Sequence, residues 1–261
     1  MNLFDLSGKI AVVTGGYGHL GWAITVGLAD AGASVYVFGR SKTSFMKAFQ
    51  TAPPSRRKRI YFERVDVASG QSTRSGFKRV LKKHKSLDIL VNNAIFVTKG
   101  DPLSLDDAKW ARGVEGVLNS VYRCLREAAP YFMSQRRGKI INVGSMYGIV
   151  SPDFSAYKQN PRILSLPHYG AAKAGVIQMT RYFAHYLGRY NIHVNAVSPG
   201  PFPNTAVQKN QQFIKALSSR TALGRIGDPE DLVGAVIFLS SRSSNFVTGH
   251  NLVVDGGWTS K

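Results

Sequence analysis

Thr14-Gly-Gly-Tyr-Gly-His-Leu-Gly21 is a glycine-rich turn between two apolar segments. Residues 9–14 before it have the composition of a buried strand, and residues 22–31 after it form an apolar helical segment. Glycines in such a turn let the backbone approach a pyrophosphate, and the free N–H groups at the start of the helix attract its charge. The stretch therefore predicts a dinucleotide-binding fold.

Strand-like and helix-like segments alternate along the rest of the chain. Further strands are expected at 33–38, 60–67, 87–91, 139–143, 192–197 and 251–254, and helices at 105–131, around 169–173 and at 229–240. Such alternation predicts the α/β class, as a single-domain Rossmann fold with a doubly wound parallel sheet and helices on both faces. No repeat or linker divides the chain, so residues 1–261 are interpreted as one domain.

Composition sets limits on where the protein works. The chain has 261 residues, of which 44% are hydrophobic, enough for one sizeable core. Cys124 is the single cysteine, so no intrachain disulfide can form. No secretory leader pattern and no long apolar segment are evident. We therefore expect a cytoplasmic protein without a membrane span.

The charge balance is strongly basic. Lys and Arg number 34 against 15 Asp and Glu, which gives a net charge of +19. Such a field attracts polyanions, including nucleic acid. Basic residues cluster at 56–59, 78–79, 82–85 and 136–137. Because no aromatic side chains interleave with these runs, a solvated surface is favoured over a nucleic-acid interface.

Tyr169-Gly-Ala-Ala-Lys173 holds a candidate acid/base pair. Residues four apart share one face of a helix. A free tyrosine has a pKa of about 10, and a nearby ammonium group favours its ionised form. The pair could therefore trade protons with a substrate. Taken alone, however, the pattern is more often a lysine that covers a half-buried ring.

The full set of motifs is far more specific than any one of them. After the turn at 14–21 come D-V at 66–67, N-N-A at 92–94, N-V-G-S at 142–145, Y-G-A-A-K at 169–173 and N-A-V-S-P-G at 195–200. In this order they resemble the short-chain dehydrogenase/reductase family, and the resemblance covers essentially the whole chain.

The resemblance implies reversible hydride transfer between a nicotinamide and a carbonyl or secondary alcohol. Tyr169 would be the acid/base, and Lys173 would lower its pKa and hold the nicotinamide ribose. Ser145 would donate a hydrogen bond to the substrate oxygen. No metal is implied.

The resemblance also implies a set of cofactor contacts. They are Gly15, Tyr17, Gly18, His19, Leu20, Gly21, Arg40, Asp66, Val67, Asn92, Ala94, Pro199, Gly200 and Asn204. Members that select NAD carry an acidic residue at the end of the second strand. Here Gly39 occupies that place and Arg40 follows, which suits a 2′-phosphate. We therefore expect NADP(H) to be preferred, with NAD as the alternative.

Three positions depart from the family pattern. His19 replaces a motif glycine, and its side chain either crowds a pyrophosphate or donates to it. Ile95 also replaces a glycine. Val117 stands where many members have a catalytic asparagine, which puts that residue's proton relay in doubt. Gly113 and Gly116 nearby could distort the helix.

The 24-residue interval from Ser145 to Tyr169 is about double that of compact members. Residues 151–168 are predicted to form an insertion beside the substrate cleft, and residues 205–221 a mobile lid. Similar inserts occur in members linked to bacterial sugar and surface-glycan metabolism. Tyr157, Lys158, Arg162 and His168 could bind a polyhydroxylated or anionic substrate; a structural loop or subunit contact is the alternative.

The sequence thus predicts an NAD(P)-dependent oxidoreductase of a small molecule, with a sugar or sugar derivative as the candidate substrate. The alternative is a cofactor-binding or cofactor-sensing protein on the same fold with weak or no turnover. The helices before and around Tyr169 build subunit interfaces in the family, which implies a homotetramer or homodimer. Arg112, Arg123 and Arg126 make this face strongly charged.

Overall fold

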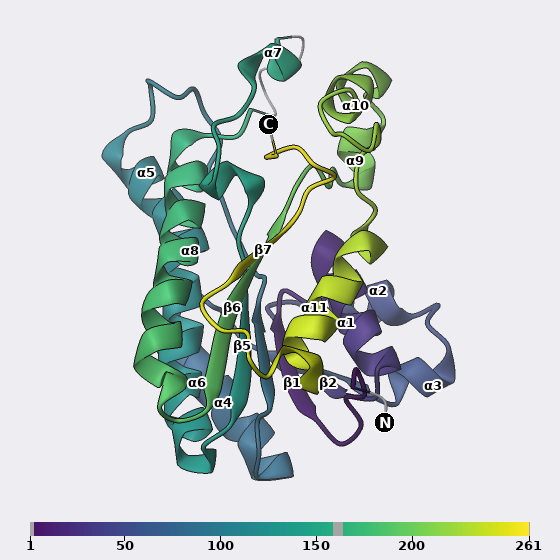
Figure 1. Ribbon diagram of the computed structural model, residues 1–261, viewed down its shortest axis with the longest axis vertical. Helices are drawn as coiled ribbons and strands as arrows, with labels where there is room; N and C mark the ends of the chain where they lie inside the picture. Colours follow the sequence, from purple (N-terminus) through teal and green to yellow (C-terminus); the bar gives the residue numbers. More distant parts are fainter. Residues whose placement is uncertain (1–2, 159–163, 261) are drawn as a thin grey trace.

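Seven parallel strands form one sheet through the part of the chain that the structure describes, residues 3–158 and 164–260 of a computed structural model (Figure 1). The strands are β1 (Ile10–Thr14), β2 (Ser34–Gly39), β3 (Ile60–Arg64), β4 (Ile89–Asn92), β5 (Gly138–Val143), β6 (Ile192–Pro199) and β7 (Asn251–Val254). Their order is β3-β2-β1-β4-β5-β6-β7, so the strand order reverses between β1 and β4. A crevice outside the carboxyl ends of the strands at such a reversal is where α/β proteins bind ligands.

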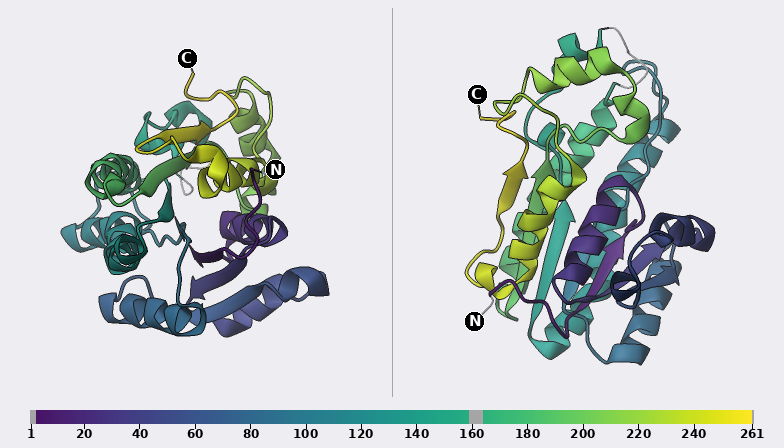
Figure 2. Two further views of the ribbon diagram at one scale, coloured as in Figure 1. Left: turned by 60° about the horizontal axis from the view of Figure 1, so that its bottom comes forward. Right: turned by 90° about the vertical axis from the view of Figure 1, so that its right-hand side faces the viewer.

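Helices cover both faces of the sheet, as predicted (Figure 2). One face carries α1 (His19–Asp30), α2 (Lys42–Phe49) and α11 (Val233–Ser240); the other carries α4 (Gly70–His84), α6 (Ser120–Gln135) and α8 (Pro167–Gly188). Because side chains alternate along a strand, Val13 packs toward α1 and α11 while Val12 packs toward α4 and α6. The short α3 (Pro54–Arg57) precedes β3.

The long helix expected at 105–131 contains a defect. Helix α5 (Asp107–Val114) passes through one π-helical turn, Glu115–Asn119, before α6 begins. A Cβ atom at Gly116 would overlap the carbonyl oxygen of Phe96, so the close approach of these two backbones requires glycine. Val117 lies in this turn and is fully buried.

The predicted insertion and lid meet beyond the sheet. Helices α7 (Phe154–Tyr157), α9 (Thr205–Gln208) and α10 (Gln211–Ser218) gather at one end of the molecule (Figure 1). They share a hydrophobic cluster formed by Met146, Ala156, Tyr157, Phe213, Leu217 and Trp258. Arg220 Nε donates to Asp153 Oδ2 at 2.5 Å and so joins the two segments by an ion pair.

The predicted insertion ends earlier than expected from the sequence. Pro167 and His168 belong to the first turn of α8, because proline is favoured there and presets the helical φ angle. Residues 159–163, which include Arg162, lie outside the described residues. In the described part of the chain, no helix is both long and apolar enough to cross a membrane.

Candidate active site

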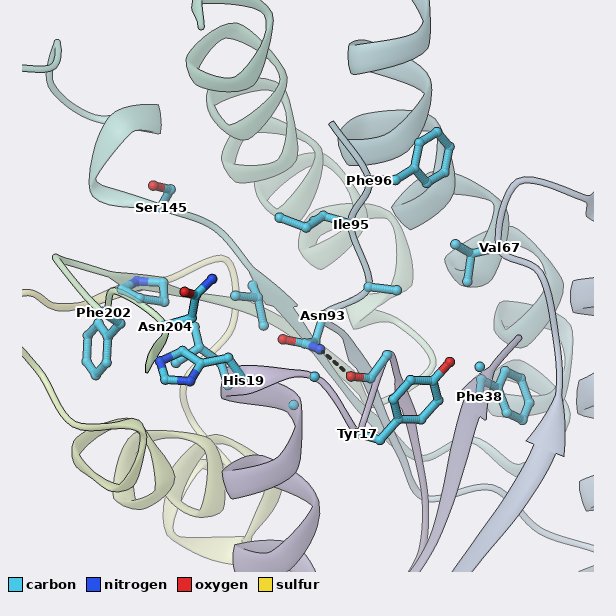
Figure 3. A pocket seen from close by; sticks show the side chains of 18 of the residues that line it. Tyr17, His19, Phe38, Val67, Asn93, Ile95, Phe96, Ser145, Phe202 and Asn204 are labelled. Carbon is cyan, nitrogen blue, oxygen red and sulfur yellow. Dashed lines mark hydrogen bonds between the residues drawn. The ribbon is translucent and has the colours of Figure 1, made fainter. Parts of the chain in front are cut away.

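A cavity of about 470 Å³ opens at the carboxyl ends of β1 and β4, where the strand order reverses. Thirteen of the fourteen predicted cofactor residues line it, as do all three predicted catalytic residues; the exception is Asn92. Figure 3 shows His19, Phe202 and Asn204 close together at one side of this pocket and Tyr17, Phe38 and Val67 at the other. The motifs that are scattered along the sequence therefore converge on one site.

The glycine turn has the shape that a phosphate group requires. Gly15 has a φ of +64°, and a Cβ atom at Gly21 would overlap the carbonyl oxygen of Gly15. Helix α1 begins at His19, and no side chain caps its N-terminus. Its first N–H groups are therefore available to an anion in the cavity.

The turns after β1 and β4 are joined by hydrogen bonds. Thr14 Oγ1 accepts from the N–H groups of Asn93 and Ala94, each at 2.9 Å. Asn93 Nδ2 donates back to the carbonyl oxygen of Thr14 at 2.9 Å. These bonds fix the floor of the cavity.

Asn92 was expected beside the cofactor, but the structure places it elsewhere. Its side chain is 2% exposed and donates to Asn142 Oδ1 at 2.8 Å, between β4 and β5. Asn93, the next residue, lines the cavity in its place. Adjacent residues at a strand end point to opposite sides, so the N-N-A motif alone did not distinguish them.

His19 joins the glycine turn to the loop after β6. Its ring donates a hydrogen bond to the backbone of Pro203, which must be to the carbonyl oxygen because proline has no N–H. Burial lowers the pKa of His19, so the ring is neutral near pH 7. Its Nε2 is buried and has no hydrogen-bond partner among the described residues.

The end of β2 carries positive charge. Arg40 is exposed and lines the cavity next to Gly39, against which the ring of Tyr17 packs. Of the described residues that line the cavity, only Asp66 is acidic. It comes from the segment after β3, and Ala68 N–H donates to its Oδ1 at 3.0 Å.

Ser145, Tyr169 and Lys173 come together at the inner end of the cavity. Ser145 follows β5 and is 6% exposed, and its hydroxyl contacts that of Tyr169 through a hydrogen bond. Lys173, one helical turn after Tyr169 on α8, is 2% exposed. Its Nζ lies 5.7 Å from the centre of the Tyr169 ring and donates to the carbonyl oxygen of Val143 at 2.5 Å.

The pKa of Tyr169 is raised, which differs from the direction expected from the sequence. Burial is the main cause, and the hydrogen bond from Ser145 opposes it. Burial also lowers the pKa of Lys173 to about 7. At pH 7 this amine is therefore only partly protonated, and its donated bond goes to the Val143 carbonyl.

Two further tyrosines lie near Tyr169, although neither is among the described residues that line the cavity. Tyr147 follows Ser145 by two residues, and Tyr157 comes from α7 in the insertion. Their hydroxyl oxygens lie 2.5 Å apart, and burial raises the pKa of both. Both rings therefore stay neutral at physiological pH and can donate or accept hydrogen bonds.

The remaining candidates divide between surface, core and cavity. Lys158 is exposed, whereas His168 is completely buried behind Gly113 and packs edge-on against Trp110. His168 therefore cannot reach a substrate as proposed from the sequence. Asn204 lines the cavity, but its Oδ1 caps α9 by accepting from the N–H groups of Ala206 and Val207 at 3.1 Å. What it can offer a ligand is its NH₂ group.

Some lining residues carried no recognisable signal in the sequence. Phe96 and Phe202 both line the cavity. Each lies two residues beyond a motif, the first after N-N-A and the second after Pro199-Gly200. Position relative to those motifs was the sole clue, since an isolated phenylalanine is more often a core residue.

Comparison with known proteins places the chain in a family. Residues 18–259 match the sequence model of a family described as enoyl-(acyl carrier protein) reductase. The chain belongs to the short-chain dehydrogenase/reductase family. As a member of that family, it is an NAD(P)-dependent oxidoreductase.

Several relatives of this short-chain dehydrogenase/reductase have names that describe their activity. It is 31% identical over 265 residues to 2-dehydro-3-deoxy-D-gluconate 5-dehydrogenase of Escherichia coli K12, covering 100% of this chain and 99% of the relative. It is 29% identical to a gluconate 5-dehydrogenase from Burkholderia cenocepacia J2315 solved with NADP and tartrate, with a TM-score of 0.87 and coverage of 100% and 98%.

A third relative was solved with the other nicotinamide cofactor. It is a short-chain dehydrogenase from Leptospira borgpetersenii with bound NAD⁺, 29% identical to this chain, with a TM-score of 0.86 and coverage of 99% and 96%. A nicotinamide cofactor is thus common to the two solved relatives, while the choice between NADP and NAD differs between them.

Proposed function

We propose that this protein is an NADP(H)-preferring oxidoreductase of a sugar derivative, with Ser145, Tyr169 and Lys173 as its catalytic residues. The observation that carries this proposal is the convergence of these three side chains at the end of a cavity that also contains the glycine turn. Hydride transfer requires a proton donor beside the carbonyl, and this arrangement supplies one next to the region that accommodates a dinucleotide.

When bound, the nicotinamide would supply the hydride, or accept it in the reverse direction. In the reduction, the Tyr169 hydroxyl donates its proton to the carbonyl oxygen of the substrate as that oxygen becomes an alkoxide. The Ser145 hydroxyl donates a hydrogen bond to the same oxygen and stabilises the developing charge. Because the pKa of Lys173 is about 7, its amine can both gain and lose a proton near neutral pH. It can therefore help to return a proton to the Tyr169 phenolate.

The substrate end of the cavity favours a hydroxylated molecule. Asn204 lines the cavity and offers its NH₂ group, and Tyr147 and Tyr157 place neutral hydroxyl groups near Tyr169, just outside the described cavity lining. A site built from such groups binds substrate hydroxyls and rejects analogues that lack them. The names of the sugar-acid dehydrogenases among the relatives support the same class.

Preference for NADP(H) rests on Arg40. A guanidinium group suits a 2′-phosphate, whereas an acidic residue at the end of β2 would accept from the free 2′-hydroxyl of NAD. Arg40 is exposed at that end of the cavity, and the ring of Tyr17 packs against the neighbouring Gly39.

Titration of the protein with NADPH and NADH, followed by nicotinamide fluorescence, tests the cofactor assignment. Tight NADPH binding that Arg40→Asp weakens at least tenfold, with NADH affinity unchanged or improved, is the expected result. Equal affinity of the variant for NADPH would overturn the role of Arg40. Turnover is then measured by loss of nicotinamide absorbance with keto-sugar acids and ketoses. Binding without turnover of any of these would favour the cofactor-sensing alternative.

A subunit interface through α6 and α8 is a further part of the proposal. Tyr122, Tyr182 and Tyr186 are exposed there, and Arg126 and Arg189 lie over tyrosine rings of the same face. Burial of these rings against a second copy would explain their exposure. Light scattering during size-exclusion chromatography distinguishes tetramer, dimer and monomer. The cytoplasmic location expected from the sequence also stays a prediction.

A further inference from the structure

A second cavity lies at the opposite edge of the sheet from the active site. Its volume is about 320 Å³, and it opens at the amino ends of β4, β5 and β6. Four cationic side chains from three segments line it: Lys9, Arg137, Lys139 and Arg242. His193 and the end of α11 complete the wall. The active-site chemistry uses none of these residues.

The carboxylates at this cavity do not neutralise its cations. Asp88 accepts from the Ile10 N–H at 3.0 Å and forms ion pairs with both Lys9, at 3.4 Å, and Arg137, at 3.6 Å. Asp5 is the second acidic lining residue; hydrogen bonds from Ser7 are the main cause of its lowered pKa, and the charge of Arg242 adds to the effect. Four cations against two carboxylates leave two positive charges in excess.

Lys139 forms no ion pair with a carboxylate among the described residues. Its Nζ donates to the carbonyl oxygen of Ser244 at 3.2 Å and to the Ser244 hydroxyl at 3.1 Å. Burial lowers the pKa of Lys139 to about 8, because its charge has lost water without gaining an anion. Ser240, which also lines the cavity, has a buried hydroxyl oxygen with no hydrogen-bond partner among the described residues.

We propose that this cavity is a binding site for a small oxyanion of the phosphate class, held by Lys139 and Arg137 with the Ser240 hydroxyl as a donor. A phosphate oxygen accepts from ammonium, guanidinium and hydroxyl groups, which are the donors gathered here. The two excess charges and the partnerless hydroxyl would then both be satisfied. Because the site is built from segments that meet only in the folded chain, its ligand stabilises the native state.

Thermal unfolding in phosphate against chloride at equal ionic strength tests this site. Saturating NADPH is present throughout, so that anions do not compete for the glycine turn. We expect phosphate to raise Tm by about 2–4 °C in the wild type. Lys139→Met should abolish that rise, and Lys139→Arg should keep most of it. Lys78→Met, which removes an exposed lysine of α4, is the matched control and should keep all of it.

The alternatives give different results. An equal rise in Lys139→Met, or no difference between phosphate and chloride in the wild type, would overturn the proposal. If Lys139→Met fails to fold, Ser240→Ala is used, and line broadening of the ³¹P signal of inorganic phosphate must be weaker with this variant than with the wild type. A sugar phosphate in place of inorganic phosphate distinguishes the free ion from a phosphate monoester as the ligand.

The pH dependence is a second readout. Binding needs the ammonium form of Lys139, so phosphate stabilisation should fall as pH rises from 7 to 9 through its pKa of about 8. The groups that face Lys139 are Asp88 before β4, Arg137 before β5, His193 on β6, Arg242 after α11, and Lys9 and Asp5 near the N-terminus. The fall should be absent in Lys139→Arg, whose guanidinium stays charged.

Discussion

The hydroxyl oxygens of Tyr147 and Tyr157 lie 2.5 Å apart, and this contact ties the insertion to the turn after Ser145. The ring of Phe213 in α10 packs against Tyr157, at 5.3 Å between ring centres. Two neighbouring segments and the distant α10 therefore fix the position of one pair of hydroxyl groups. Such an arrangement holds the hydroxyl groups more rigidly than a mobile loop could.

Replacement of Tyr157 by Phe should weaken substrate binding selectively. The ring still packs on Phe213, but the hydroxyl that orients Tyr147 is lost. We expect KM to rise about fivefold with kcat within a factor of three, since one hydrogen bond contributes about 1 kcal/mol. Steady-state kinetics with the best substrate provides the measurement, and an unchanged KM would contradict the role of this hydroxyl.

Loss of the proton donor should abolish turnover without loss of cofactor binding. Tyr169→Phe and Ser145→Ala should each lower kcat/KM by about 10²–10⁴. NADPH affinity should stay within about threefold, because neither hydroxyl lies in the glycine turn. Parallel kinetic and fluorescence titrations check both parts. A variant that keeps half of the wild-type rate would remove that residue from the mechanism.

Lys173 should make stability depend on pH in a defined window. Its pKa in the folded protein is about 7, whereas that of an exposed lysine is about 10.4, so the unfolded chain binds more protons between these values. Burial of the charged ammonium lowers the free energy of unfolding, and this effect is full below pH 7. It is relieved as pH rises, because the folded protein then loses the Lys173 proton. Relative to Lys173→Met, the wild type should gain about 2 kcal/mol in unfolding free energy between pH 7 and 9.

Urea unfolding of both proteins at several pH values measures this difference. Since the two chains share every other titratable group, the difference isolates Lys173. Parallel stability curves for the two proteins would show that the lysine is not held in this environment.

The ion pair between Arg220 and Asp153 should control the lid. Arg220 also donates to the Ser155 hydroxyl at 2.5 Å, so its removal frees the insertion from the segment after α10. Arg220→Met should raise KM about three- to tenfold and speed proteolytic cleavage within 205–221, as expected for a loosened lid. Arg56→Met, which breaks the exposed ion pair with Asp30, is the control and should change neither KM nor the rate of proteolytic cleavage. Equal behaviour of the two variants would refute the clamp.

The π-helical turn should be intolerant of a side chain at Gly116. A methyl group there would overlap the Phe96 carbonyl, so we expect Gly116→Ala to lower the free energy of unfolding by about 1–3 kcal/mol. Gly188→Ala is a matched control at the end of α8, where no atom lies within 4 Å of the added carbon. Thermal or denaturant unfolding should show a lower stability for Gly116→Ala and little change in stability for Gly188→Ala.

Local patterns predicted the sheet well because they depend on short-range chemistry. The turn at 14–21, the buried strand before it, and the β7 bounds agree with the structure. Features set by distant contacts were not predictable. Whether Asn92 or Asn93 faces the cavity depends on Asn142 and Thr14, and the burial of His168 depends on the absence of a side chain at Gly113.

The direction of the Tyr169 pKa shift was also not predictable from the sequence, because it too depends on contacts in the folded chain. Spacing on a helix places Lys173 near the ring, but it says nothing of how much water either group keeps. Burial raises the pKa of Tyr169 and lowers that of Lys173, and it outweighs the attraction between them. The predicted NADP preference is of a different kind, since it rests on Arg40 and stays a prediction until cofactor binding is measured.

The hydrophobic cluster around Tyr157, Phe213 and Trp258 shares no residue with the two clusters that flank the sheet. Substitutions inside it therefore leave the packing beneath the glycine turn untouched. During evolution, residues 151–158 and 205–221 could be replaced together, as one unit. Such a replacement would change the substrate and leave the cofactor-binding residues unchanged. Exchange of either segment alone would break the Asp153–Arg220 pair and the shared packing, so the two segments are expected to evolve, and to be transplanted, as a pair.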